Sequence, residues 1–209
     1  MKVYLFGGAE KGQARAELKL IEKVINELSP AQVLHIPFAR TGSSWPEWKG
    51  DWFRRNINLK KGIKYLRASR SKDMLMVNSP LIFISGGNEC SRLIKKIKES
   101  KKLLSLIKNA EYIIGESAGS KLLGEYQRIE NGQLVKGLGI LKDSLIEPHY
   151  STKKRQKLLL EEMRKTKVRF GVGIDSLTAL VAEVHEFPKK YGEIGLGKIE
   201  LKRRKIKKA

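Results

Sequence analysis

The sequence lacks the features by which many proteins are cross-linked or anchored. It contains one cysteine, Cys90, so no disulfide can form within the chain, which suits a reducing cytoplasm. No apolar run approaches the ~20 residues that a membrane-spanning helix needs. The N-terminal residues lack the apolar region and cleavage site of a signal peptide. These absences predict a cytoplasmic protein with no membrane partner.

Acidic residues are scarce relative to basic ones. Lys and Arg total 43 against 22 Asp and Glu, which gives a formal net charge of +21. Such an excess suits nucleic-acid binding, attraction of an anionic substrate, or a lysine-rich surface without a specific partner. The basic residues are spread along the chain, and no helix-turn-helix, zinc-finger or aromatic RNA-binding signature is present. Nucleic acid is therefore an alternative partner rather than the expected one.

Apolar segments of strand and helix type alternate along most of the chain. This order predicts one α/β domain over residues 1–201, followed by a basic tail at 202–209. Expected strands cover 2–6, 32–37, 63–66, 80–85, 111–114, 168–174 and 178–184, with a hairpin over 194–201. Expected helices cover 14–28, 45–57, 90–107, 121–125 and 152–165, and the third of these could divide around Ser100. The alternation predicts a mostly parallel sheet with helices on both faces and a ligand site at the C-terminal strand ends.

The segment Gly115-Glu116-Ser117-Ala118-Gly119 follows one of these strands and precedes a helix. Gly-x-Ser-x-Gly in that context is typical of a nucleophile elbow, in which a tight turn exposes the serine above the strand end. The N–H of Ala118 would then point at the same space and could hold an oxyanion. The alternative is a glycine-rich turn with a capping serine.

A second oxyanion donor is expected from a neighbouring loop. Gly86-Gly87-Asn88 follows the strand 80–85, and glycine allows close approach of the backbone to a substrate. This loop is therefore placed to supply the second donor. The alternative is a plain helix-entry turn with Asn88 as N-cap, and both interpretations can hold together.

Three histidines are available as a base for the serine. His35 lies inside a strand and is best interpreted as a hydrogen-bonded structural residue, whereas His185 is expected in a surface turn. His149 follows Pro148 in an extended segment that leads into a loop, so it is the leading candidate. Cys90 is a rival nucleophile because it lies at an expected helix start, although a small packed residue is the simpler interpretation.

Taken together, these segments resemble the dipeptidase E and cyanophycinase family of serine peptidases. The resemblance rests on Gly7-Gly8, Gly86-Gly87-Asn88, Ser117-Ala118-Gly119 and Pro148-His149-Tyr150. It implies a flavodoxin-like α/β sandwich related to class I glutamine amidotransferases. It also implies that Ser117 is the nucleophile and His149 its general base, with oxyanion donors at Gly87 and Ala118 and no metal or organic cofactor.

The resemblance also implies how an acidic substrate is held. In the family, a basic residue shortly after the histidine binds an acidic substrate side chain, and Arg155 matches that position best, with Lys153 close by. A guanidinium can grip a carboxylate through two parallel hydrogen bonds. The alternative for Arg155 is a solvated helix face. Asn88 is a further candidate for contact with the substrate.

The sequence departs from the family at the third member of the triad. The family tends to carry a glutamate after the late glycine-rich strand, but here Ser176 stands at that position with Asp175 beside it. Asp175 is the first candidate for orienting His149. Glu125, Glu130 and Glu147 are the others.

We therefore predict a cytoplasmic serine peptidase acting on small acidic peptides, such as dipeptides with an N-terminal aspartate. The missing glutamate motivates a second hypothesis, a family member that binds an acidic peptide or metabolite without cleaving it. The charge motivates a third, a nucleic-acid-associated protein. A homodimer is compatible with the sequence.

Overall fold

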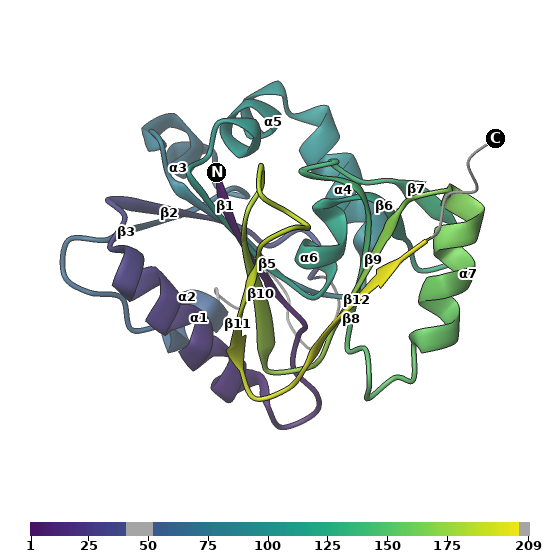
Figure 1. The fold of residues 1–209 in the computed structure, drawn as a ribbon. Helices are drawn as coiled ribbons and strands as arrows, with labels where there is room; N and C mark the ends of the chain where they lie inside the picture. The colour runs from purple at the N-terminus through teal and green to yellow at the C-terminus, as the bar shows by residue number, and fades with distance from the viewer. Residues whose placement is uncertain (41–51, 205–209) are drawn as a thin grey trace.

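The computed structural model describes residues 1–40 and 52–204, which form two sheets flanked by helices (Figure 1). The main sheet has the strand order β11-β10-β1-β5-β4-β2-β3. Its strands are β1 (Lys2–Phe6), β2 (Gln32–Ile36), β3 (Lys64–Arg67), β4 (Leu81–Ile84), β5 (Tyr112–Glu116), β10 (Thr178–Glu183) and β11 (Gly192–Gly195). The strands from β1 to β3 in this order pair in parallel, and β10 and β11 add antiparallel strands at one edge.

Helices cover both faces of the main sheet, as the alternation of segments predicts. The helices of the described residues are α1 (Ala14–Leu28), α2 (Trp52–Asn56), α3 (Ser71–Met76), α4 (Cys90–Glu99), α5 (Lys101–Lys108), α6 (Ala118–Leu122) and α7 (Gln156–Thr166), the last of which packs on the second sheet described below. Successive side chains of a strand point to opposite faces, and β1 uses both of them. Tyr4 and Phe6 pack with α1 and α2, whereas Val3 and Leu5 pack in the core that contains α4 and α5. Figure 1 shows these helices on opposite sides of the sheet.

Several predicted elements are confirmed. The first strand and the helix 14–28 have the predicted bounds, and the expected helix 90–107 divides into α4 and α5. The division occurs at Ser100, whose side chain accepts a hydrogen bond of 3.2 Å from Leu103 N and so caps α5. Of the expected helix 45–57, the structure describes α2 only, and Trp45 and Trp48 lie outside the described residues.

The second sheet was not predicted. Its order is β12-β9-β8-β6-β7, with β6 (Gly124–Arg128), β7 (Leu134–Lys136), β8 (Leu141–Pro148), β9 (Phe170–Ile174) and β12 (Ile199–Arg203). The helix predicted at 121–125 is wrong, because α6 occupies 118–122 and β6 begins at Gly124. Strand β6 mixes polar and apolar residues without a clear period, so its sequence gives a weak strand signal.

The predicted hairpin over 194–201 is also wrong. β11 pairs with β10 in the main sheet, whereas β12 pairs with β9 in the second sheet. The two segments are adjacent in sequence, but the connection carries the chain from one sheet to the other. The boundary expected between residues 201 and 202 falls inside β12, so Lys202 and Arg203 are strand residues and not part of a tail.

The two sheets bring several loops to one place. The C-terminal ends of β4, β5 and β1 are neighbours in the main sheet, so the loops after Ile84, Glu116 and Phe6 meet at one edge. The chain after β8 reaches the same edge, because His149 N donates a 2.9 Å hydrogen bond to Gly7 O. Across residues 1–40 and 52–204, none of the helices combines the length and the apolar character that crossing a membrane requires.

Candidate active site

Ser117 stands on a strained turn between β5 and α6. Its φ is 50° and its ψ is −106°, a conformation that costs a non-glycine residue free energy and is characteristic of functional turns. A 3.0 Å hydrogen bond from Ser117 N to Phe6 O connects the turn to the end of β1. A Cβ on Gly115 would lie 2.8 Å from Ser120 N, and one on Gly119 would collide with the carbonyl oxygen of Ile84. The glycines therefore permit the close approach of β5, α6 and β4.

His149 follows the last residue of β8 and lies over the end of β1. Its φ is 53°, and its Nε2 lies 3.0 Å from Ser117 Oγ. The structure thus brings together the serine and the histidine that the sequence indicated. Burial lowers the pKa of His149, although a hydrogen bond to Glu10 acts in the opposite direction. The ring is therefore neutral near pH 7, as a base must be.

The carboxylate beside His149 is Glu10, from the loop between β1 and α1. Its Oε1 lies 2.8 Å from His149 Nδ1 and accepts a 2.7 Å hydrogen bond from Ser176 Oγ. The prediction that Asp175 contacts His149 is wrong. Asp175 accepts hydrogen bonds from Ser151 N at 2.9 Å and Lys198 N at 3.1 Å, so it ties its loop to two neighbouring segments.

The other carboxylates considered for this role also have different partners. Glu125 accepts a hydrogen bond from Asp143 N at 2.6 Å, and Glu130 accepts one from Ser91 N at 2.9 Å. Glu147 is buried against the guanidinium groups of Arg128 and Arg155. Sequence reasoning missed Glu10. The signal that could have found it is an acidic residue in the loop directly after a strand that borders the elbow.

Two backbone N–H groups border the cavity in front of Ser117. Gly87 and Ala118 both line this cavity, and among the described residues neither N–H donates a hydrogen bond. Gly87 has a φ of 156°, and a Cβ there would collide with Ala39 O. Free donors next to a nucleophile can stabilise the negative charge that develops on a carbonyl oxygen.

Glu116 holds the loop that carries Gly87. This residue is buried directly before the serine, and its Oε2 accepts a 2.9 Å hydrogen bond from Gly86 N. Both of its oxygens also lie 3.0 Å from Nη2 of Arg40. Because a hydrogen-bonded ion pair fixes both partners, Glu116 links the elbow to the neighbouring loop. The sequence pattern did not assign Glu116 a role.

The cavity has a volume of about 620 Å³ and is rich in charged side chains. The basic residues in its lining are Arg40, Lys121, Arg128, Lys153 and Arg155. Arg155 is paired with buried Glu147, so it is not a freely solvated helix residue. Within residues 1–40 and 52–204, the ammonium of Lys153 forms no hydrogen bond or ion pair, which leaves it available to a ligand.

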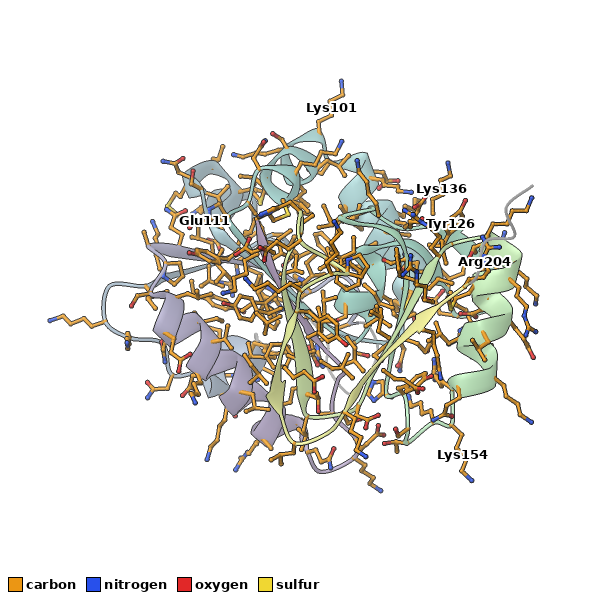
Figure 2. The ribbon with its side chains drawn as sticks, in the orientation of Figure 1. Lys101, Glu111, Tyr126, Lys136, Lys154 and Arg204 are labelled. Carbon is orange, nitrogen blue, oxygen red and sulfur yellow. The ribbon has the colours of Figure 1, made fainter. Side chains whose placement is uncertain are left out.

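Many of the other basic residues that the structure describes are exposed. Figure 2 shows Lys101 and Lys154 extending from opposite ends of the molecule, and both are exposed.

The other two histidines and Cys90 lie in surroundings that suit structural residues better than a base or a nucleophile. His35 is buried, stacks on Phe83 at 4.9 Å and is hydrogen bonded to Tyr65, as expected for a structural histidine. His185 is exposed in a turn, as predicted. Burial raises the pKa of the Cys90 thiol, so this residue is not an activated thiolate.

Asn88 lines the cavity but does not cap α4. The helix begins at Cys90, with Glu89 in the N-cap position. The interpretation of Asn88 as an N-cap is therefore wrong.

Comparison with known proteins gives matches of three kinds. The model of peptidase family S51 matches residues 3–189. Cyanophycinases from Synechococcus elongatus and Thermosynechococcus vestitus are each 32% identical over 116 residues, a match that covers 49% of this chain and 36% of theirs. The chain thus spans about a third of the length of these curated relatives.

The fold is similar to a crystal structure of a peptidase from an acI-B1 Actinobacterium. The TM-score is 0.60 at 22% sequence identity, and the match covers 97% of this chain and 90% of the other. At this identity the likeness concerns the fold alone. It agrees with the flavodoxin-like α/β architecture that the sequence predicts.

Proposed function

The chain belongs to peptidase family S51, a family of serine peptidases, and we propose that it hydrolyses small peptides, in particular dipeptides with an N-terminal aspartate. The single observation that supports this most is the 3.0 Å contact between Ser117 Oγ and His149 Nε2 at the wall of a cavity. A serine on a strained elbow with an imidazole in hydrogen-bond reach is the arrangement that activates an alcohol as a nucleophile.

In the proposed reaction, Ser117 Oγ attacks the scissile carbonyl carbon while His149 Nε2 takes the hydroxyl proton. The N–H groups of Gly87 and Ala118 stabilise the oxyanion that forms. When the tetrahedral intermediate collapses, the C–N bond breaks and His149 returns the proton to the leaving amine. A water molecule then hydrolyses the acyl-enzyme by the same route, with His149 taking a proton from water and delivering it to Ser117.

The basic lining of the cavity supports an acidic substrate. We assign recognition of the substrate carboxylate to Lys153, whose ammonium forms no hydrogen bond or ion pair among the described residues, and to Arg155 next to it, which also pairs with Glu147. Asn88 lies in the same lining and could contact the peptide. A volume of about 620 Å³ is in the usual range of small-molecule sites, which favours a dipeptide over a folded protein.

The hypothesis of a family member that binds without cleaving loses its main support. It was motivated by the absence of a carboxylate at position 176, and Glu10 supplies a carboxylate at 2.8 Å from His149 Nδ1. The hypothesis of a nucleic-acid-associated protein rests on the formal net charge of +21 alone.

Replacement of the nucleophile tests the proposal. We expect Ser117→Ala to lower kcat/KM for aspartyl p-nitroanilide by roughly 10⁴-fold or more, because the attacking oxygen is removed. Chromogenic release of p-nitroaniline measures this directly. Alanyl p-nitroanilide, which lacks the acidic side chain, should be hydrolysed more slowly by the parent enzyme.

The matched control is Ser105→Ala, at an exposed serine of α5. It should keep the parent kcat/KM. Full turnover in the Ser117→Ala protein would remove the nucleophile assignment, and equal rates on the aspartyl and alanyl substrates would remove the substrate assignment.

A further inference from the structure

One carboxylate oxygen connects three segments that are far apart in the sequence. Oε1 of Glu10 lies 2.8 Å from His149 Nδ1 and 2.7 Å from Ser176 Oγ, which donates a hydrogen bond to it. Ser176 Oγ also lies 3.3 Å from His149 Nδ1. Nδ1 of His149 therefore faces two oxygens, Glu10 Oε1 and Ser176 Oγ, which are hydrogen bonded to each other. Among the described residues, no other carboxylate is hydrogen bonded to this nitrogen.

The backbone fixes this group. The loop after β1 receives a 2.9 Å hydrogen bond from His149 N at Gly7 O and a 3.0 Å hydrogen bond from Leu177 N at Gly8 O. Glu10 is held in turn by Gln13, whose Oε1 accepts from Glu10 N at 3.1 Å and whose N donates to Glu10 O at 3.0 Å. The segments that contribute the histidine, the carboxylate and the serine are thus locked to one another by main-chain bonds.

We propose that Glu10 is the acidic positioning residue for His149, and that Ser176 fixes the Glu10 carboxylate in place. The inference rests on the proposed peptidase function. Glu10 accepts the Nδ1–H of His149, so the ring presents Nε2 as acceptor to Ser117. The third member of the triad therefore comes from the first loop of the chain. Asp175, which the sequence suggested for this role, instead accepts hydrogen bonds from the backbone of Ser151 and Lys198.

The electrostatics of the site agree with this role. Burial raises the pKa of Glu10, but hydrogen bonds from Ser176 and His149 outweigh that effect and lower it, so the carboxylate is ionised at pH 7. Burial lowers the pKa of His149 most and the charges of Lys153 and Arg155 lower it further, whereas the hydrogen bond and charge of Glu10 raise it. Glu10 is thus the group that stabilises the imidazolium formed when His149 takes the serine proton.

Glu10→Gln tests the inference, because it keeps the shape of the side chain and removes its charge. We expect kcat/KM to fall about 10²- to 10⁴-fold. The pKa of His149 should also fall, because the group that raises it is gone, so the acid limb of kcat/KM should move to lower pH. NMR titration of the labelled ring gives the same pKa without any need for activity.

Glu27→Gln is the matched control, since it alters the net charge equally at an exposed position of α1. It should leave both kcat/KM and the His149 titration unchanged. A purely structural role of Glu10 would lower activity without moving the titration of His149.

A second variant moves the charge instead of deleting it. Ser176 Oγ is 3.3 Å from His149 Nδ1, so an aspartate at 176 would place a carboxylate within reach of the ring. We expect Glu10→Gln combined with Ser176→Asp to recover at least about tenfold of the lost kcat/KM and to restore the His149 pKa.

The inference is overturned if Glu10→Gln leaves the titration of His149 unmoved, whatever happens to the rate. Failure of the proposed function is a different result. In that case the parent protein hydrolyses no peptide and is not labelled at Ser117 by a serine-directed phosphonate, while the NMR titration still reports on Glu10.

Discussion

The two sides of the Ser117–His149 contact are built in different ways. The serine side is one continuous segment, residues 115–120, in which two glycines and a strained serine are close in sequence. The histidine side is assembled from three loops, and its central hydrogen bond joins residues that are 139 positions apart. The serine side is thus formed by the backbone of neighbouring residues, whereas the histidine side is formed by tertiary contacts between distant segments.

This difference determines how substitutions on each side affect stability and activity. The elbow is packed against β4 and β1, so an added atom there displaces backbone. On the histidine side, main-chain bonds join the loops, but the ring itself is oriented by side-chain hydrogen bonds, and Glu10 keeps 27% side-chain exposure. Changes at the elbow should therefore affect stability and activity together, whereas changes around His149 should affect mainly activity.

Among changes that compare the two sides, Gly119→Ala at the elbow should have the largest combined effect on stability and activity. A methyl group there would collide with the carbonyl oxygen of Ile84, so α6 or the end of β4 must move. We expect the free energy of unfolding to fall by about 1–3 kcal/mol and kcat/KM to fall more than about 100-fold, because Ser117 is displaced. Urea unfolding and the nitroanilide assay measure the two quantities.

The control for this change is Gly192→Ala, where the added methyl group meets nothing within 4 Å. It should be neutral in both assays. If Gly119→Ala is as stable and active as the parent, the elbow is less tightly packed than its geometry indicates.

Gly8→Ala should produce an effect on activity with a smaller one on stability. The added methyl carbon would lie 2.5 Å from His149 Nε2 and 3.0 Å from Ser117 Cβ, so it would push apart the reacting pair. We expect about a 100-fold loss of kcat/KM and a stability loss of about 1–2 kcal/mol from the positive φ alone. The same two assays apply.

Gly132→Ala separates these two causes. Gly132 has a φ of 82°, close to the 91° of Gly8, but an added methyl group there meets nothing within 4 Å. It should show the stability loss without the loss of activity. Equal activity losses in both variants would mean that backbone strain, and not contact with His149, is responsible.

The smallest effect is expected for Glu17→Gln, beneath the elbow. Burial and the nearby charge of Glu116 raise the pKa of Glu17 well above its ordinary value. Its contribution to stability is therefore fully present at low pH and is lost as the pH rises through the raised pKa. Glutamine does not titrate, so the variant should gain on the order of 1 kcal/mol over the parent at pH 8 and less at pH 5.

Urea unfolding at pH 5, 6.5 and 8 measures this difference, with the exposed Glu27→Gln as control. A difference that is the same at all three values would show that Glu17 does not titrate in this range. A gain that grows toward low pH would reverse the sign that burial predicts.

The sequence identified the residues of the serine side more completely than those of the histidine side. The sequence pointed to Ser117, Gly87 and Ala118 through patterns within a few positions, and the structure places all three at one cavity. His149 was found by choosing among three histidines on the basis of their segments. Glu10 was not found, because its signal, a position just after a strand that borders the elbow, depends on knowing which strands are neighbours in the sheet.

The sequence by itself determined the elbow and the alternation of strands and helices in the main sheet, since both follow from residue types at short spacing. Only the tertiary structure decided which carboxylate meets His149, and that β11 and β12 join different sheets. The physical reason is that those pairings depend on how the strand ends are brought together in space, a relation that local spacing does not contain.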